Sequence, residues 1–139
     1  MRRKVKGRMV SGGIAEGEAL VCKAPIGFNF GVDLDTGVIL EHNHPLETIS
    51  IKDKVLIFPY GKGSTGGSYV VYAIAKNKTG PKAMINLNTE TIIAVGAIMG
   101  KIPVMDHLEV NPFDVIETGD YVKVNADEGY VEITKKGGK

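Results

Sequence analysis

Four glycines fall within seven residues of the segment Gly61-Lys62-Gly63-Ser64-Thr65-Gly66-Gly67-Ser68, and this cluster limits the possible folds more than any other stretch. An apolar run over residues 55–60 precedes it and predicts a buried strand, whereas residues 69–76 are typical of a helix. A glycine-rich turn from strand to helix directs backbone N–H groups and small hydroxyls toward a ligand, and anions bind well there. We therefore predict an anion site at this turn.

The residues around the turn predict a β-α-β-α-β order. This order is typical of a small parallel sheet with two crossover helices, the second capped by Asn88-Thr89. The expected elements are strands over 55–58, 82–87 and 102–105 and helices over about 65–76 and 90–99.

Extended segments flank this middle part on both sides, so strands are expected near both chain ends. They lie over 4–10, 17–23, 36–40 and 113–116, followed by a hairpin over 121–125 and 130–134. We predict one α/β domain over 1–139, with flanking antiparallel strands and with 1–4 and 135–139 frayed.

Charge and cysteine content exclude several classes of function. The net charge of +1 carries no strong field for nucleic acid or a membrane surface. The longest apolar run, 92–99, is far shorter than a membrane helix, which needs about 20 residues. Cys22 is the single cysteine, which excludes an internal disulfide and favours a reducing, cytoplasmic compartment. One thiolate also cannot hold an iron–sulfur cluster, so any cluster must belong to another chain.

Ser64 is the residue in the turn with the chemistry of a base or nucleophile. The order of residues is not that of a P-loop, and the spacing of Gly61, Gly63 and Gly66 matches a dinucleotide motif by letter only, without the acidic residue. Holding Ser64 as an alkoxide at pH 7 requires a shift of about eight pKa units, on the order of 11 kcal/mol. A helix N-terminus supplies only about 0.3–2 kcal/mol, so Lys62 or a partner chain must help. The alternative is that Ser64 simply caps the helix.

Other polar residues are candidates on residue type alone. His42 and His44 are two apart in a predicted loop but lack a third metal ligand nearby, so no metal site is predicted. His107 follows a predicted parallel strand, at the end where ligands bind in such sheets. Glu16 and Asp33 are also candidates, with solvated loop acids and turn chemistry as the alternatives.

Several segments together resemble the small subunit, or swivelling domain, of the aconitase X family. They occur in family order over about residues 6–134. The matching segments are Gly12-Gly13-Ile14-Ala15-Glu16-Gly17-Glu18-Ala19, Pro25-Ile26 with Phe28, Gly31-Val32-Asp33 with Thr36-Gly37-Val38-Ile39, His44-Pro45-Leu46, the glycine-rich segment itself, Ala94-Val95-Gly96-Ala97, and Ile102-Pro103-Val104.

This resemblance implies a swivelling β/β/α domain that docks on a larger iron–sulfur chain as a heterodimer. It implies a hydro-lyase whose 4Fe–4S cluster, on the large subunit, acts as Lewis acid on the leaving hydroxyl. The family's serine base matches Ser64, and the substrate-binding positions are Lys62, Gly63, Thr65, Gly66 and Gly67, with Glu16, Asp33 and His44 as further candidates. Many relatives carry Arg where this chain has Lys62.

The resemblance leaves two substrates open. Archaeal small subunits of this kind serve the dehydration of (R)-5-phosphomevalonate to trans-anhydromevalonate 5-phosphate in a mevalonate pathway, which is the first expectation. Other relatives dehydrate cis-3-hydroxy-L-proline. A third interpretation, from the residues alone, is a non-catalytic binding module.

Overall fold

The structure is a computed structural model that describes residues 2–29, 31–62 and 66–136. Its elements are β1 (Arg2–Lys6), β2 (Arg8–Ser11), β3 (Ile14–Val21), β4 (Ile26–Gly27), β5 (Val55–Ile57), β6 (Gly61–Lys62), α1 (Gly66–Lys76), β7 (Ala83–Ile85), α2 (Thr91–Gly100), β8 (Val104–Asp106), α3 (Pro112–Val115), β9 (Tyr121–Asn125) and β10 (Tyr130–Thr134).

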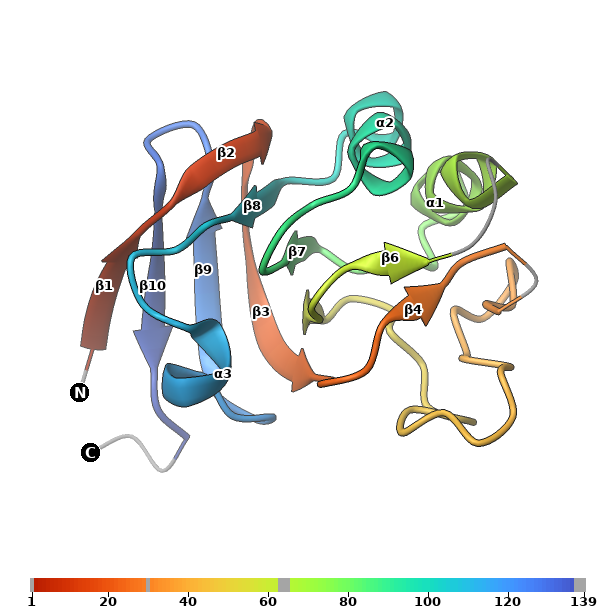
Figure 1. Ribbon diagram of the computed structural model, residues 1–139, viewed down its shortest axis with the longest axis horizontal. Coiled ribbons are helices and arrows are strands. Elements are labelled where there is room, and N and C mark those ends of the chain that lie inside the picture. Colours follow the sequence, from red (N-terminus) through yellow and green to blue (C-terminus); the bar gives the residue numbers. More distant parts are fainter. Residues whose placement is uncertain (1, 30, 63–65, 137–139) are drawn as a thin grey trace.

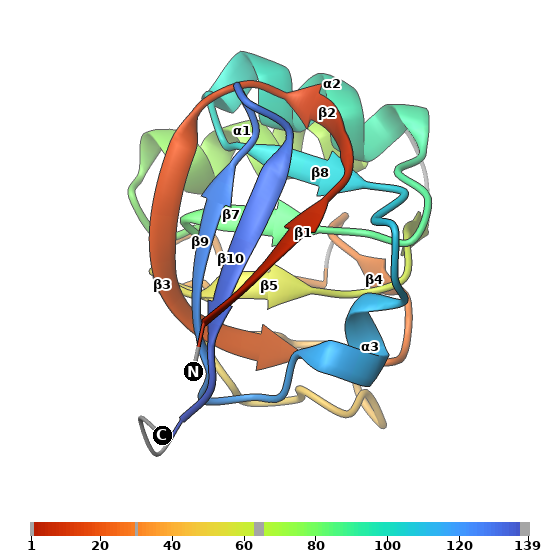
Figure 2. The same ribbon diagram turned by 90° about the vertical axis from the view of Figure 1, so that its left-hand side faces the viewer.

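Within those ranges, eight strands form one mixed sheet in the order β1-β10-β9-β3-β5-β7-β8-β2, and β4 pairs separately with β6. The neighbours from β3 through β5 and β7 to β8 are parallel, which confirms the predicted β-α-β-α-β unit. The remaining pairs of the eight-stranded sheet are antiparallel, including the predicted hairpin of β9 and β10. β3 pairs with β9 through its first half and with β5 through its second half, so the sheet bends there. Figure 2 shows the antiparallel strands lying across the parallel ones.

The parallel strands are buried on both faces. Successive strand residues point to opposite faces, so Leu56 and Met84 face the core beneath α1 and α2, whereas Val55, Ile57 and Ile85 face the core shared with the antiparallel strands. The burial of both faces of β5 explains why residues 55–58 are an uninterrupted apolar run in the sequence. The molecule therefore has three layers: antiparallel strands, parallel strands and helices (Figure 1).

The two crossover helices pack closely along their length on one side of the parallel strands (Figure 1). Gly96 and Gly100, four residues apart on α2, make this approach possible. A Cβ added at Gly96 would lie 2.7 Å from Ser68 O and from Val71 Cβ, and one at Gly100 would lie 2.7 Å from Ala75 Cβ. None of the helices described here is long and apolar enough to cross a membrane.

The N-terminal segment differs from its predicted single strand over 4–10. It divides at Gly7 into β1 and β2, which pair at opposite ends of the sheet order, with β10 and with β8. A Cβ at Gly7 would lie 2.3 Å from Leu108 Cδ2 and 3.2 Å from Asp106 O, so a larger residue would require the Leu108 side chain to move. Residues 2–4, which we expected to be frayed, are paired within β1.

Three other expectations were wrong in local detail. Residues 112–115 form α3 instead of a strand, because Asn111 Oδ1 accepts from Phe113 N at 2.9 Å and Pro112 opens the helix. Residues 36–40 make only isolated bridges, such as Val38 with Ser50. Glu90 caps α2 in place of Asn88-Thr89: its Oε1 accepts from Ile93 N at 3.3 Å, whereas the Thr89 hydroxyl donates to Asn86 Oδ1.

Candidate active site

The glycine-rich turn lies beyond the carboxyl ends of the parallel strands. β6 pairs in parallel with β4, which follows β3, and α1 begins at Gly66 (Figure 1). Ser64, with Gly63 and Thr65, lies outside the described residues, so the structure describes only the residues on either side of these three. Ligands commonly bind at this end of parallel α/β sheets, and the anion site at the turn stays a prediction.

The glycines that flank the turn lie against close neighbours. A Cβ at Gly61 would lie 2.4 Å from Ile93 Cγ1, in the first turn of α2. A Cβ at Gly66 would lie 2.7 Å from Asn29 Oδ1, and one at Gly67 would lie 3.1 Å from Ile92 Cγ2. The described ends of the glycine-rich segment therefore lie between the loop that follows β4 and the start of α2.

Lys62 carries the cation predicted for this site, and its ammonium has a partner. Its Nζ lies 2.9 Å from Glu41 Oε2, and both side chains are partly exposed. The pair connects β6 to the loop that follows β4, 21 residues earlier in the chain. Glu41 was missed by the sequence analysis because nothing in its local pattern distinguishes it from a solvated acid.

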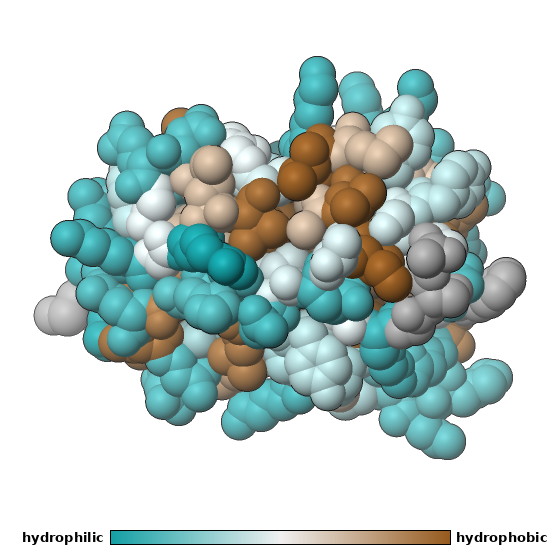
Figure 3. All heavy atoms as spheres, turned by 45° about the horizontal axis from the view of Figure 1, so that its top comes forward, coloured by the Kyte–Doolittle hydropathy of each residue, from teal (hydrophilic) through white to brown (hydrophobic). Residues whose placement is uncertain are grey.

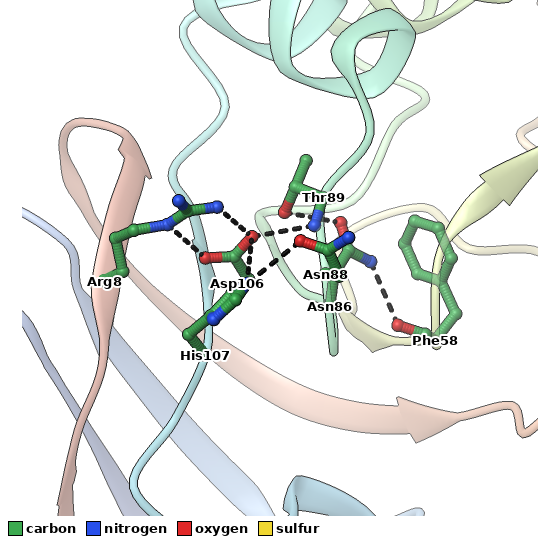
Figure 4. Close-up of polar contacts among 7 residues, drawn as sticks. All are labelled: Arg8, Phe58, Asn86, Asn88, Thr89, Asp106 and His107. Carbon is green, nitrogen blue, oxygen red and sulfur yellow. Dashed lines mark hydrogen bonds and ion pairs between the residues drawn. The ribbon is translucent and has the colours of Figure 1, made fainter.

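A second polar cluster lies at the carboxyl ends of β7 and β8 (Figure 4). Asp106 is fully buried, and both of its oxygens accept from Arg8, through Nε and Nη2 at 2.8 Å each. The Thr89 N–H donates to Asp106 Oδ2 at 2.7 Å. Burial by itself raises the pKa of Asp106, but the Arg8 and Thr89 hydrogen bonds outweigh it, so the pKa lies below its usual value. The carboxylate therefore joins β2, β8 and the start of α2.

Asn88 and His107 extend this cluster toward the segment that precedes the glycine-rich turn, and we call these two residues the rim. The Leu87 N–H donates to Pro59 O at 3.0 Å, and the His107 N–H donates to Leu87 O. The His107 side chain is exposed, and its Nε2 lies 2.9 Å from Asn88 Oδ1. His107 thus follows the end of β8, as predicted, on the same edge as the turn.

The other predicted residues lie elsewhere. Glu16 accepts from Tyr121 Oη at 2.9 Å and lines a hollow of the antiparallel strands together with Lys123. Asp33 Oδ1 accepts from Asp35 N at 2.8 Å, which is turn chemistry. The structure does not bring these two carboxylates into the rim beside the glycine-rich turn.

His44 is buried and uses both ring nitrogens within the fold. Its Nδ1 accepts from Leu46 N at 3.0 Å, so the proton is on Nε2, which donates to Pro25 O at 3.0 Å. His44 therefore ties its loop to the segment before β4. His42 instead pairs with Glu47 at the surface, at 2.9 Å.

The described residues contain no group of three or more His, Cys, Asp or Glu side chains arranged to hold a metal ion. Cys22 is buried, and its thiol donates to Ala24 O at 3.4 Å. Burial raises the pKa of the Cys22 thiol, which disfavours the thiolate that a metal would need.

The described residues thus bring Lys62, Asn88 and His107 to the edge of the parallel strands from which the glycine-rich segment leaves. A model of the aconitase X swivel domain matches residues 4–133. The chain belongs to the aconitase X swivel domain family.

Individual relatives support this membership over nearly the whole chain. The phosphomevalonate dehydratase small subunit of Methanosarcina mazei is 53% identical over 96% of this chain and 93% of its own. That of Archaeoglobus fulgidus is 50% identical over 91% of this chain and 95% of its own. The crystal structure of Thermococcus kodakaraensis aconitase X in its holo-form has a TM-score of 0.88 at 47% identity, over 94% of this chain and 98% of that one.

Proposed function

We propose that this chain is the small subunit of a hydro-lyase that dehydrates (R)-5-phosphomevalonate to trans-anhydromevalonate 5-phosphate, a step in a mevalonate route to isoprenoids. The observation that carries this proposal is the similarity to the two archaeal small subunits named above, at about half identity over nearly full length. Their name implies a large subunit, and the open rim is consistent with a site that a second chain completes. The single cysteine supports a place in the cytoplasm.

In this proposal Ser64 accepts the proton. Dehydration breaks a C–H bond on one carbon and the C–OH bond on its neighbour, so that a double bond forms and water leaves. Lys62 and the backbone N–H groups of 63–67 bind an anionic group of the substrate and stabilise the Ser64 alkoxide. In the free chain the Lys62 ammonium pairs with Glu41 at 2.9 Å, so in this role it exchanges the Glu41 carboxylate for the anionic group of the substrate.

We further propose that the large subunit carries the 4Fe–4S cluster. The side chains of this chain do not fit such a group: a cluster takes several thiolates, and the one cysteine is buried and engaged with Ala24 O. The part that we assign to this chain is therefore proton removal and anion binding.

The test is turnover by the purified pair of subunits with Ser64→Ala. We expect a loss of kcat of about 10²- to 10⁴-fold, the usual contribution of a general base, with the two subunits still associated. Ser68→Ala is the matched control: its hydroxyl donates to Ile92 O at 2.7 Å inside the fold, so its loss costs about 1 kcal/mol of stability and leaves kcat unchanged.

Two outcomes would contradict the proposal. A Ser64→Ala pair with near wild-type kcat would remove the serine from the reaction. Turnover of cis-3-hydroxy-L-proline without turnover of 5-phosphomevalonate would assign the other substrate.

A further inference from the structure

The outer face of α2 is apolar and uncovered. The helix sequence, Thr91-Ile92-Ile93-Ala94-Val95-Gly96-Ala97-Ile98-Met99-Gly100, has no charged residue. Its inner side chains pack on α1 and the core, yet Val95, Ile98 and Met99 are 42%, 56% and 59% exposed. A helix that is apolar on all sides is normally buried on all sides.

These three exposed side chains form one stripe with the half-buried Ile92. Ile92, Val95 and Met99 are spaced by three and four residues, and Ile98 lies beside them, so all four share a helix face. Figure 3 shows strongly hydrophobic side chains gathered on the side of the molecule that carries α2. We call these four residues the α2 patch. Charged residues occur only beyond its ends, at Glu90 and Lys101, and an apolar centre with a polar rim is the usual anatomy of a protein interface.

The α2 patch is continuous with the candidate active site. Ser68 Oγ in α1 donates to Ile92 O at 2.7 Å, and a Cβ at Gly61 would meet Ile93 in the same first turn. A chain that completes the site at the glycine-rich turn therefore comes up against the start of α2.

We infer that the α2 patch is the docking surface for the large subunit, and that the large subunit meets it with an uncharged, apolar surface. This inference rests on the proposed function only for the existence of that partner. Burial of aliphatic and Met side chains on association supplies the hydrophobic driving force, and a charge placed in the centre would be left desolvated.

The experiment measures the Kd of the large subunit for Val95→Glu and Ile98→Glu by titration calorimetry. We expect Kd to rise at least tenfold for each, with the circular dichroism and the melting temperature of the isolated small chain unchanged. Ile49→Glu is the matched control, because Ile49 is 42% exposed like Val95 and lies in the loop between β4 and β5, away from α2. Its Kd should equal that of the wild type.

Three results would overturn the inference. The first is wild-type Kd for both patch variants, and the second is an equal loss for Ile49→Glu. The third is that the patch variants abolish self-association of the isolated chain, measured by sedimentation, while the Kd for the large subunit stays unchanged. Turnover is measured separately: a pair that binds tightly but leaves 5-phosphomevalonate intact would contradict the proposed function and leave the docking surface standing.

Discussion

Replacing Asp106 with Asn tests the reasoning about the second polar cluster. The variant keeps the size of the side chain but loses the charge that Arg8 and the Thr89 N–H share, at 2.8 and 2.7 Å. Hydrogen bonds to a charged group contribute about 1.5–3 kcal/mol. Arg8 is 57% exposed and regains water when its partner is lost, so we expect a total loss of about 2–3 kcal/mol, below the range for fully buried pairs.

This loss translates into a measurable melting temperature. An unfolding entropy of about 2.1 cal/mol/K per residue over 139 residues makes 1 kcal/mol equivalent to about 3.4 °C. Differential scanning calorimetry at pH 7 should therefore show Asp106→Asn melting about 7–10 °C below the wild type. A melting temperature within about 2 °C of the wild type would refute the assignment of Asp106 as the carboxylate that holds β2, β8 and α2 together.

The same variant has a predicted pH dependence. The folded pKa of Asp106 is lowered from its ordinary value of 3.8, so its contribution to stability is full above that value and is lost as the pH falls through the folded pKa. The gap in melting temperature between wild type and Asp106→Asn should be constant near neutral pH and should narrow below about pH 3.8. A gap that widened in acid would contradict the sign of this shift.

Two further substitutions test the packing of the helices and the role of the cation. Gly96→Val should lower the free energy of unfolding by about 1–3 kcal/mol, because its Cβ would lie 2.7 Å from Ser68 O and Val71 Cβ. Chemical denaturation measures this loss. Thr91→Val, on the exposed side of α2, is the control and should unfold like the wild type. Lys62→Met should raise KM for 5-phosphomevalonate by about 10- to 100-fold, the loss of one charged hydrogen bond, with stability changed by less than about 1 kcal/mol. Steady-state kinetics of the purified pair measures it, and Lys54→Met, which removes the comparable exposed pair with Glu18, should leave KM unchanged.

Strong local patterns predicted the elements that the structure confirms. The hairpin of β9 and β10 follows from alternating residues around a turn that ends in Gly129, which has a φ of 79° that glycine adopts easily. The strand before the glycines and the helix after them were equally clear in the sequence. Where the cue was weak, the interpretation failed: Asn111 and Pro112 signal a helix start, but the apolar residues after them also suit a strand.

The sequence by itself therefore determined the parallel unit and its helices, because each depends on neighbouring residues, and it predicts where along the chain an anion binds. Only the tertiary structure decided that Arg8 meets Asp106, 98 residues away, and that Glu41 meets Lys62, because long-range pairing leaves no mark in local periodicity. It also decided which side of α2 is left uncovered. An apolar helix looks the same in sequence from every side, and only the position of α1 against Gly96 shows that Val95 and Ile98 face outward.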